Sequence, residues 1–314
     1  MANNEAKGYS SERAELRKQG GGSEPDQHEL DAALKQIKEM GCFVAGTLVH
    51  TKEGLKPIEQ IKVGDYVLSK PESGEGELSY QPVTRTYEYE ERDVYFVSWR
   101  VMDQGTNQPT NTPGHAVVTG CHPIWVHRRV EYPLSDTGVT ERVTEVNGWM
   151  SIEEIYLHRW KHYWEGRGGG VRPWVELWDG RLATIQFVEP VLQSKDLDTG
   201  VGFTDDEYWE MDPIGIEIRF EKDGPKIIYD DGVLPRKRYL GSIDDIDYDY
   251  SGYDTENAMS VVRRSHGFLP IRRPVYNLEV ENTHTYFVTE SGLWVHNTNG
   301  IAETELPLEG IKGG

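Results

Sequence analysis

Two stretches at opposite ends of the sequence carry residue types that could cut a peptide bond. In the first, GCFVAGTLVHT, Cys42 directly follows Gly41 and precedes an apolar run. A thiol is intrinsically more nucleophilic than a hydroxyl, and a small fraction of it is thiolate at neutral pH. Gly41 offers an unhindered carbonyl and nothing in the stretch indicates a packing need for glycine, so the Cys42 sulfur could attack it and form a thioester. The alternative is a buried structural cysteine.

The second stretch is GLWVHNTNG, in which His296 and Asn297 precede Thr298. An asparagine side-chain amide can attack its own backbone carbonyl, which forms a succinimide and cuts the bond to the next residue. Because the amide nitrogen is a poor nucleophile, this reaction needs a general acid, and His296 is adjacent. His284, in NTHTYFV, is available from the neighbouring predicted strand.

A third stretch, VTGCHPIWV, could activate the Gly41–Cys42 peptide. Thr119 and His122 lie three residues apart, and a strand that leads into a turn could aim the hydroxyl and the imidazole at one amide. The alternative is an ordinary solvent-facing histidine in a turn bounded by proline. Taken together, the three stretches predict a protein that cuts its own backbone.

Composition excludes several other classes of function. The chain has 314 residues and a net charge of −20, which argues against binding to nucleic acid, because phosphates demand a basic face. No apolar run approaches the roughly 18 residues that a membrane-spanning helix needs, and the N-terminus does not resemble a signal peptide. We therefore expect cytoplasmic synthesis, with any export by a route that uses no signal peptide. Two cysteines do not make a disulfide framework.

The local pattern predicts a mainly β domain behind a polar leader. A short helix is expected over residues 23–40, and a longer one over residues 152–164. Between them and beyond, short β-branched and aromatic runs alternate with Gly, Pro, Asp and Asn, which is typical of strands and turns. The predicted strands include TLVHT, DYVLS, VYFVSWR, HAVVTG, PIWVHRR and LATIQFVE, with a hairpin in IEIRFEKDGPKIIY and two or three further strands in VYNLEVENTHTYFVTESGLWV.

Metal and DNA chemistry find weak support in the sequence. Cys121 is next to His122, but no second ligand pair follows at zinc spacing, and His158 and His162 lack a third partner. The segment from Asp196 to Glu256 holds eighteen acidic and six basic residues. It offers carboxylates at calcium-loop spacing, at Asp245, Asp247, Asp249 and Glu256, but Tyr250 replaces the required glycine. LGSIDDID is a poor copy of an endonuclease motif without a basic groove. We predict neither a metal nor a cofactor.

Four blocks of the sequence resemble, in order, the blocks of Hint domains, the superfamily of inteins, bacterial intein-like domains, polymorphic-toxin Hint modules and hedgehog autoprocessing domains. The blocks are CFVAGTLVHTKEGLKPIEQIKVGDYVLS, VVTGCHPIWV, GWMSIEEI and VYNLEVENTHTYFVTESGLWVHN. They cover roughly Cys42 to Leu157 and Pro274 to Asn297, and their order and final His-Asn pair make the resemblance specific. The polymorphic-toxin and bacterial intein-like branches are the most similar.

The resemblance implies a horseshoe-like β fold that brings both junctions together. Residues 1–41 would be the leader, 42–297 the autoprocessing domain, and 298–314 a tail released on cleavage. The surplus length falls in an acidic insertion at roughly 165–272. The substrates would be the chain's own flanking segments, and a toxin setting would add partners from that system.

The resemblance also implies a role for each site residue. Cys42 would be the nucleophile, Thr119 and His122 would activate the Gly41–Cys42 amide, His296 and His284 would assist, and Asn297 would cyclise. Asn277 stands where inteins often carry an acidic residue, so proton transfer between the two steps is expected to differ. The Thr298 hydroxyl could complete splicing, but threonine is a poor, β-branched nucleophile, and we expect C-terminal cleavage to dominate. Zn²⁺ is expected to inhibit by binding Cys42 and nearby histidines.

Two other functions stay open at this point. A cysteine hydrolase acting on other molecules would use Cys42 and a distant histidine, but it would leave Gly41 and the final His-Asn pair unexplained. A catalytically degenerate Hint scaffold would act as a binding module through the acidic insertion, which is rich in Tyr and Trp. Single-turnover autoprocessing is the function that accounts for all three stretches.

Overall fold

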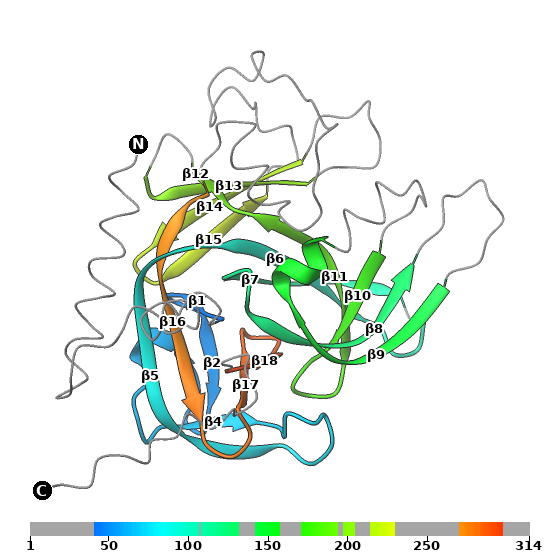
Figure 1. Cartoon of the computed structure of the whole chain (residues 1–314). Coiled ribbons are helices and arrows are strands. Elements are labelled where there is room, and N and C mark those ends of the chain that lie inside the picture. The colour runs from blue at the N-terminus through cyan, green and yellow to red at the C-terminus, as the bar shows by residue number, and fades with distance from the viewer. Residues whose placement is uncertain are drawn as a thin grey trace, which may run out of the picture. The chain divides into compact units, whose positions relative to one another are not determined.

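The computed structural model describes residues 41–106, 108–131, 142–157, 171–193, 197–204, 214–229 and 270–297. Gly41–Asn297 form one compact unit. Strands dominate this unit (Figure 1), which confirms the predicted mainly β fold. The predicted leader helix, the calcium-loop candidate, the endonuclease-like motif, the His158/His162 pair and Thr298 lie outside the described residues. Within those residues, no helix has the length and apolar character needed to span a membrane.

The described residues of this unit form eighteen strands. They are β1 (Phe43–Val44), β2 (Leu48–Thr51), β3 (Gly54–Pro57), β4 (Tyr66–Ser69), β5 (Ser79–Asp93), β6 (Tyr95–Met102), β7 (Pro109–Val118), β8 (Pro123–Glu131), β9 (Arg142–Ser151), β10 (Val171–Glu176), β11 (Leu182–Pro190), β12 (Leu192–Gln193), β13 (Thr199–Thr204), β14 (Ile214–Glu221), β15 (Gly224–Tyr229), β16 (Arg272–Val280), β17 (Thr285–Val288) and β18 (Leu293–His296). A short 3-10 helix, η1 (Ile58–Gln60), follows β3, and residues 152–157 are helical.

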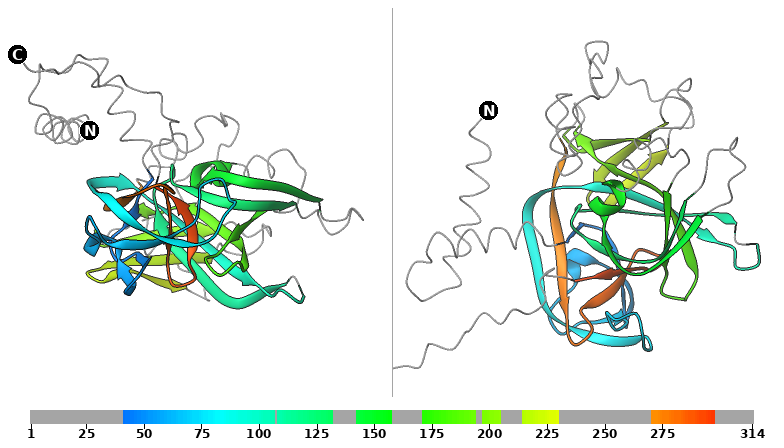
Figure 2. Two further views of the ribbon diagram at one scale, coloured as in Figure 1. Left: turned by 90° about the horizontal axis from the view of Figure 1, so that it is seen from below. Right: turned by 45° about the vertical axis from the view of Figure 1, so that its right-hand side comes forward.

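In the described part of the chain, one large antiparallel sheet of 14 strands contains β1 and β18, the strands that follow Cys42 and precede Asn297. Its order is β10-β11-β6-β7-β1-β16-β5-β4-β2-β17-β18-β8-β9, with β3 paired to β2. Because β10 also pairs with β8, the strand pairing closes on itself through β10. The views of Figure 2 show the long pair of β5 and β16 curving along one side of this sheet. The strands β12 to β15 form a second sheet.

The predicted strands are present. TLVHT and DYVLS become β2 and β4, and VYFVSWR and PIWVHRR become β6 and β8. HAVVTG contains the end of β7. The predicted hairpin is β14 and β15, although Glu221 pairs with Gly224, so the turn residues are Lys222 and Asp223 and not the expected Asp-Gly pair. The closing block supplies three strands, β16 to β18.

The range predicted as an insertion does not form one separate segment. Val171–Glu176 and Leu182–Pro190 lie inside it, yet β10 pairs with β8 and β11, and β11 pairs with β6 along nearly its whole length. Val175 and Ala183 are completely buried. The first part of the range therefore belongs to the main sheet.

The core is assembled from both ends of the unit. Phe43 in β1, Tyr286 in β17 and Val295 in β18 are all buried in one hydrophobic cluster. Burying one such side chain contributes roughly 1.5–3 kcal/mol, although this value is reduced by the entropy lost on ordering. The same packing that stabilises the fold thus holds the residues next to each junction.

Candidate active site

Gly41 lies directly against His122. A Cβ atom added to Gly41 would be 2.3 Å from Nδ1 of His122 and 2.6 Å from its Cα. Such distances are shorter than any real contact, so no larger residue fits without moving the histidine. The expectation that packing places no demand on Gly41 was therefore wrong. The local sequence around Gly41 does not show that His122, which is distant in sequence, packs against it.

Thr119 binds the nitrogen of the Gly41–Cys42 peptide. The Cys42 N–H donates to Oγ1 of Thr119 at 2.8 Å, and the Thr119 N–H donates to the Cys42 carbonyl at 2.9 Å. Pairing of Phe43 with Val118 between β1 and β7 sets this register. The hydroxyl also lies 3.6 Å from the sulfur of Cys121. Thr119 is therefore at the atom where the sequence analysis placed it.

The side chains at this junction are buried away from solvent. Cys42 is 1% exposed, and burial raises the pKa of its thiol well above the ordinary value; Cys121 adds to the increase and Arg92 opposes it. His122 is completely buried, and burial lowers its pKa to about 3. The Gly41 backbone raises this pKa by a smaller amount, and His296 lowers it further. The imidazole is consequently neutral at physiological pH.

Asn297 follows β18 and is held through its backbone. Its N–H donates to the His284 carbonyl at 2.8 Å, and its own carbonyl accepts a hydrogen bond from Nδ2 of Asn277 at 3.1 Å. The side chain is buried, and its Nδ2 has no hydrogen-bond partner among the described residues. The nitrogen that would attack is therefore uncommitted, while the carbonyl that would be attacked is bound to a donor.

Two donors orient the Asn277 amide. Its Oδ1 accepts hydrogen bonds from the Tyr286 hydroxyl and from the Leu278 N–H, both at 2.8 Å. Since both partners are donors, the acceptor oxygen must face them, and Nδ2 must face Asn297. The sequence analysis did not identify Tyr286, although it lies within the last matched block, VYNLEVENTHTYFVTESGLWVHN.

Tyr286 connects the two junctions. It is completely buried, which raises the pKa of its hydroxyl well above the ordinary value, and the charge of Cys42 raises it further. Its ring lies 6.5 Å, centroid to centroid, from that of Phe43, the residue after Cys42, and its hydroxyl is bonded to Asn277, which holds Asn297. Through these contacts the fold brings the Cys42 and Asn297 ends of the unit together.

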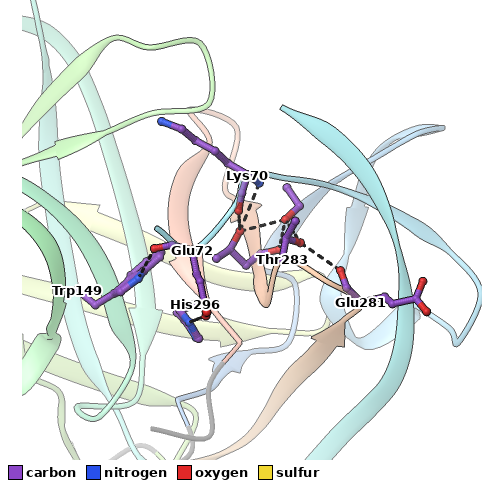
Figure 3. A network of polar contacts seen from close by, with 8 residues as sticks. Lys70, Glu72, Trp149, Glu281, Thr283 and His296 are labelled. Atoms are coloured by element: carbon purple, nitrogen blue, oxygen red, sulfur yellow. Dashed lines mark hydrogen bonds and ion pairs between the residues drawn. The ribbon is translucent and has the colours of Figure 1, made fainter. Parts of the chain in front are cut away.

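His296 is paired with a carboxylate. Its Nε2 lies 2.9 Å from Oε2 of Glu72, and its ring packs edge-on against Trp149 with 4.8 Å between centroids (Figure 3). Burial lowers the pKa of His296, Glu72 raises it, and His284 lowers it slightly. Its Nδ1 is buried and has no hydrogen-bond partner within the described part of the chain. Nothing in the sequence marks Glu72 as a site residue.

His284 contacts Asn297 through its backbone and not its ring. It has a left-handed backbone with φ of 54°, its side chain is exposed, and its carbonyl accepts the Asn297 N–H. No hydrogen bond of its imidazole is found within the described ranges. The predicted assistance by this imidazole therefore stays a prediction.

A metal centre is not evident in the described ranges. No group of three or more His, Cys, Asp or Glu side chains converges there. The two cysteines, Cys42 and Cys121, are not joined in a disulfide. The chemistry that the site can perform is acyl transfer by thiol, amide and imidazole groups.

The sequence matches no protein-family model and no curated protein. Among solved structures, a bacterial intein-like domain from Clostridium thermocellum is 17% identical, with 81% of this chain and 97% of that chain covered at a TM-score of 0.36. The chain resembles inteins and intein-like domains. A DnaB intein from Synechocystis sp. PCC 6803 is 8% identical (82% and 99% covered, TM-score 0.38), and the gp41-1 intein is 12% identical (82% and 98%, TM-score 0.33). With TM-scores below 0.5, the functional conclusions rest on the residues of this chain.

Proposed function

We propose that residues 41–297 form an intein-like Hint domain that cuts its own backbone, with cleavage after Asn297 favoured over splicing. One observation carries the proposal: the Asn297 carbonyl is bound by Asn277, while the Asn297 side-chain nitrogen is buried without a hydrogen bond in the described structure. A buried amide without a partner is rare and unfavourable, so its presence at this position calls for a functional explanation. Cyclisation of Asn297 provides one.

The C-terminal step is an attack of Asn297 Nδ2 on the carbonyl carbon of the same residue. A ring C–N bond forms, the bond to Thr298 breaks, and one Nδ2 proton passes to the leaving nitrogen of Thr298. The products are a C-terminal succinimide and a tail with a free amino group. Asn277 Nδ2 already faces the oxygen on which negative charge develops, so it can stabilise the tetrahedral intermediate.

The N-terminal step is an attack of the Cys42 sulfur on the Gly41 carbonyl. A thioester forms, the Gly41–Cys42 amide bond breaks, and the thiol proton ends on the Cys42 nitrogen. Thr119 holds this nitrogen, and the neutral His122 ring lies against Gly41, where it can carry the proton between the two atoms. Both steps use only the side chains of this chain, and its own flanking segments are the substrates.

The preference for cleavage over splicing follows from the nucleophiles. Splicing requires the Cys42 thioester first and then an attack by the Thr298 hydroxyl. Burial raises the pKa of the Cys42 thiol, so its reactive thiolate is scarce. Threonine is the weaker and more hindered nucleophile of the second step. Asn297 cyclisation begins from a neutral group and needs neither event.

The experiment is intact-mass analysis of the purified chain incubated at neutral pH. A free peptide Thr298–Gly314 is expected from the wild type and from Cys42→Ala, but not from Asn297→Ala. Hydroxylamine should release the Met1–Gly41 leader from the wild type and not from Cys42→Ala. A leader joined directly to Thr298–Gly314 would reverse the proposed order of steps.

One observation favours a second function, a catalytically degenerate scaffold that binds partners. The Cys42 thiol is nearly inaccessible, as expected for a residue that serves only to fill the core. In that case the incubated wild-type chain stays intact at both junctions. A toxin setting, its partners and export without a signal peptide stay predictions from the sequence resemblance.

A further inference from the structure

The turn after β4 is fixed in place by two contacts that flank Glu72. On one side, the Lys70 N–H and carbonyl both bond to Oγ1 of Thr285, in β17. On the other, Nε1 of Trp149 donates to the Glu72 carbonyl at 3.0 Å. The Lys70 ammonium also pairs with Glu176 at 2.9 Å. Figure 3 shows His296, Glu72 and Trp149 together. The backbone at Glu72 is therefore held from two strands before its side chain makes any contact.

An aromatic cluster supports the same position. Trp149 packs against Trp125 and Trp294, with ring centroids 5.1 and 5.0 Å away, and against the His296 ring. The hydrogen bond of Trp149 to the Glu72 carbonyl and its ring contact with His296 come from one rigid side chain. Because Trp149 contacts both partners, it fixes the distance between them.

We propose that Glu72 is a positioning residue that sets the proton and the orientation of His296 for cleavage after Asn297. The inference rests on the proposed function. It adds a role for Glu72, which lies outside the four matched sequence blocks. A carboxylate can only accept hydrogen bonds, so Nε2 of His296 must carry the proton when the two are in contact at 2.9 Å. In the neutral ring, Nδ1 is then the acceptor.

This tautomer suits the cyclisation. Nδ1 of His296 and Nδ2 of Asn297 are both buried, and neither has a hydrogen-bond partner among the described residues, so the two nitrogens must approach each other for the proposed transfer. Nδ1 takes one proton from Asn297 Nδ2 as the ring bond forms, which makes the imidazolium. The same proton is then given to the Thr298 nitrogen as that bond breaks, so the imidazole is regenerated and no other reactant is needed. Glu72 stabilises the imidazolium between these events.

Two titratable side chains act on His296, and His296 in turn acts on a third, His122. Glu72 favours its protonated form, His284 disfavours it, and the buried His122 senses it. The Glu72 carboxylate is 53% exposed, so solvent weakens its influence and the effect of its removal falls at the low end for an ion pair. Loss of the carboxylate lowers the pKa of His296, which makes the neutral ring a weaker base toward Asn297 and removes the charge that stabilises the imidazolium formed during the step.

The test compares Glu72→Gln with Glu77→Gln, which removes the same charge from an exposed site in the same connection. Release of Thr298–Gly314 is followed by mass from pH 5 to pH 9. Glu72→Gln should be about threefold slower at neutral pH, with its pH–rate profile shifted toward acid, and Glu72→Asp should recover part of the rate. Glu77→Gln should match the wild type. Unchanged profiles in Glu72→Gln would overturn the proposal, as would an equal shift in Glu77→Gln.

A second measurement does not depend on cleavage. In the Asn297→Ala background, NMR titration of His296 should give a lower midpoint with Glu72→Gln than without it. Equal midpoints would overturn the assignment of Glu72 whatever the cleavage result. A lower midpoint together with an uncut wild-type chain would uphold the Glu72–His296 coupling and refute the proposed self-cleavage, so the two failures are distinguishable.

Discussion

The two junctions of the unit lie in different electrostatic surroundings. At the N-terminal one, the Cys42 thiol and the His122 ring are both fully enclosed, and burial opposes the charged form of each. At the C-terminal one, His296 is paired with the half-exposed carboxylate of Glu72, and Asn297 is bound through its carbonyl. Burial at the first junction disfavours the charged forms of Cys42 and His122, whereas at the second junction Glu72 favours the charged form of His296.

This difference indicates which reaction is easier to start. Thioester formation requires a thiolate in a site of low dielectric constant, where an isolated charge is unfavourable. Asparagine cyclisation starts from a neutral amide, and its developing oxyanion and imidazolium each face a partner that is already in place. The proposed preference for cleavage after Asn297 over reaction at Cys42 rests on this difference.

The largest expected effect is at the oxyanion. Asn277→Ala removes the donor to the Asn297 carbonyl, and release of Thr298–Gly314 should slow by roughly a hundredfold to a thousandfold. Mass analysis of timed samples measures the rate. Gln186→Ala removes an amide side chain from another strand of the sheet and should release the tail at the wild-type rate. Equal rates for Asn277→Ala and wild type would remove the proposed difference between the junctions.

The next effect tests the packing of the N-terminal junction. Gly41→Ala forces a methyl group into His122, so the free energy of unfolding should fall by about 2 kcal/mol and hydroxylamine should no longer release the leader. Urea denaturation measures the first and mass analysis the second. Gly148→Ala, whose new methyl group would have its nearest neighbour at 3.7 Å, is the matched control. Full leader release by Gly41→Ala would show that close packing there is dispensable.

The third effect is a dependence of stability on pH. The pKa of His122 is lowered to about 3 from 6.5, so the stability it contributes is fully present above pH 6.5 and is lost as the pH falls from 6.5 toward 3. His122 should account for up to about 1.4 kcal/mol per pH unit in this window. Denaturation across pH should give a shallower slope for His122→Asn than for wild type or for His127→Asn. Identical slopes would contradict a neutral, buried His122.

The smallest effect tests the link between the junctions. Tyr286→Phe removes one of two donors that orient Asn277, which is worth about 1 kcal/mol, so tail release should slow about fivefold. Tyr276→Phe loses a hydroxyl that, among the described residues, donates to the exposed Glu88, and it should have no effect on the rate. If both variants cleave equally fast, the Tyr286 hydroxyl does not position Asn277.

Strands with apolar, β-branched sequences were predictable, and one long strand was not. The run VYFVSWR became β6 because its side chains are mostly buried. By contrast, β5 consists of SYQPVTRTYEYEERD, which is rich in polar and charged residues and has a single buried side chain, that of Val83. Its pairing with β16 over nearly its whole length makes it a strand, and a partner almost two hundred residues away leaves no local signal.

The reactive residue types at the site were predictable from the sequence. The residues that hold and orient them were not. Cysteine, asparagine and histidine stand out because few residues can perform acyl transfer. Glu72 does not, since it shares its connection with Glu75 and Glu77 and only the fold selects it. The exposed ring of His284 shows the opposite case, in which a residue type suited to the chemistry contributes a backbone carbonyl to the site.

The sequence alone determined the β class of the fold and the two pairs of residues, Gly41 with Cys42 and His296 with Asn297, that could carry the chemistry. Periodicity and side-chain reactivity are local properties, so they can be read without knowing what lies nearby. The tertiary structure decided which neighbours act on those pairs: His122 over Gly41, Asn277 and Tyr286 behind Asn297, and Glu72 on His296. Burial and hydrogen bonding depend on residues that are distant in sequence, and those interactions set pKa values and fix the reacting atoms in place.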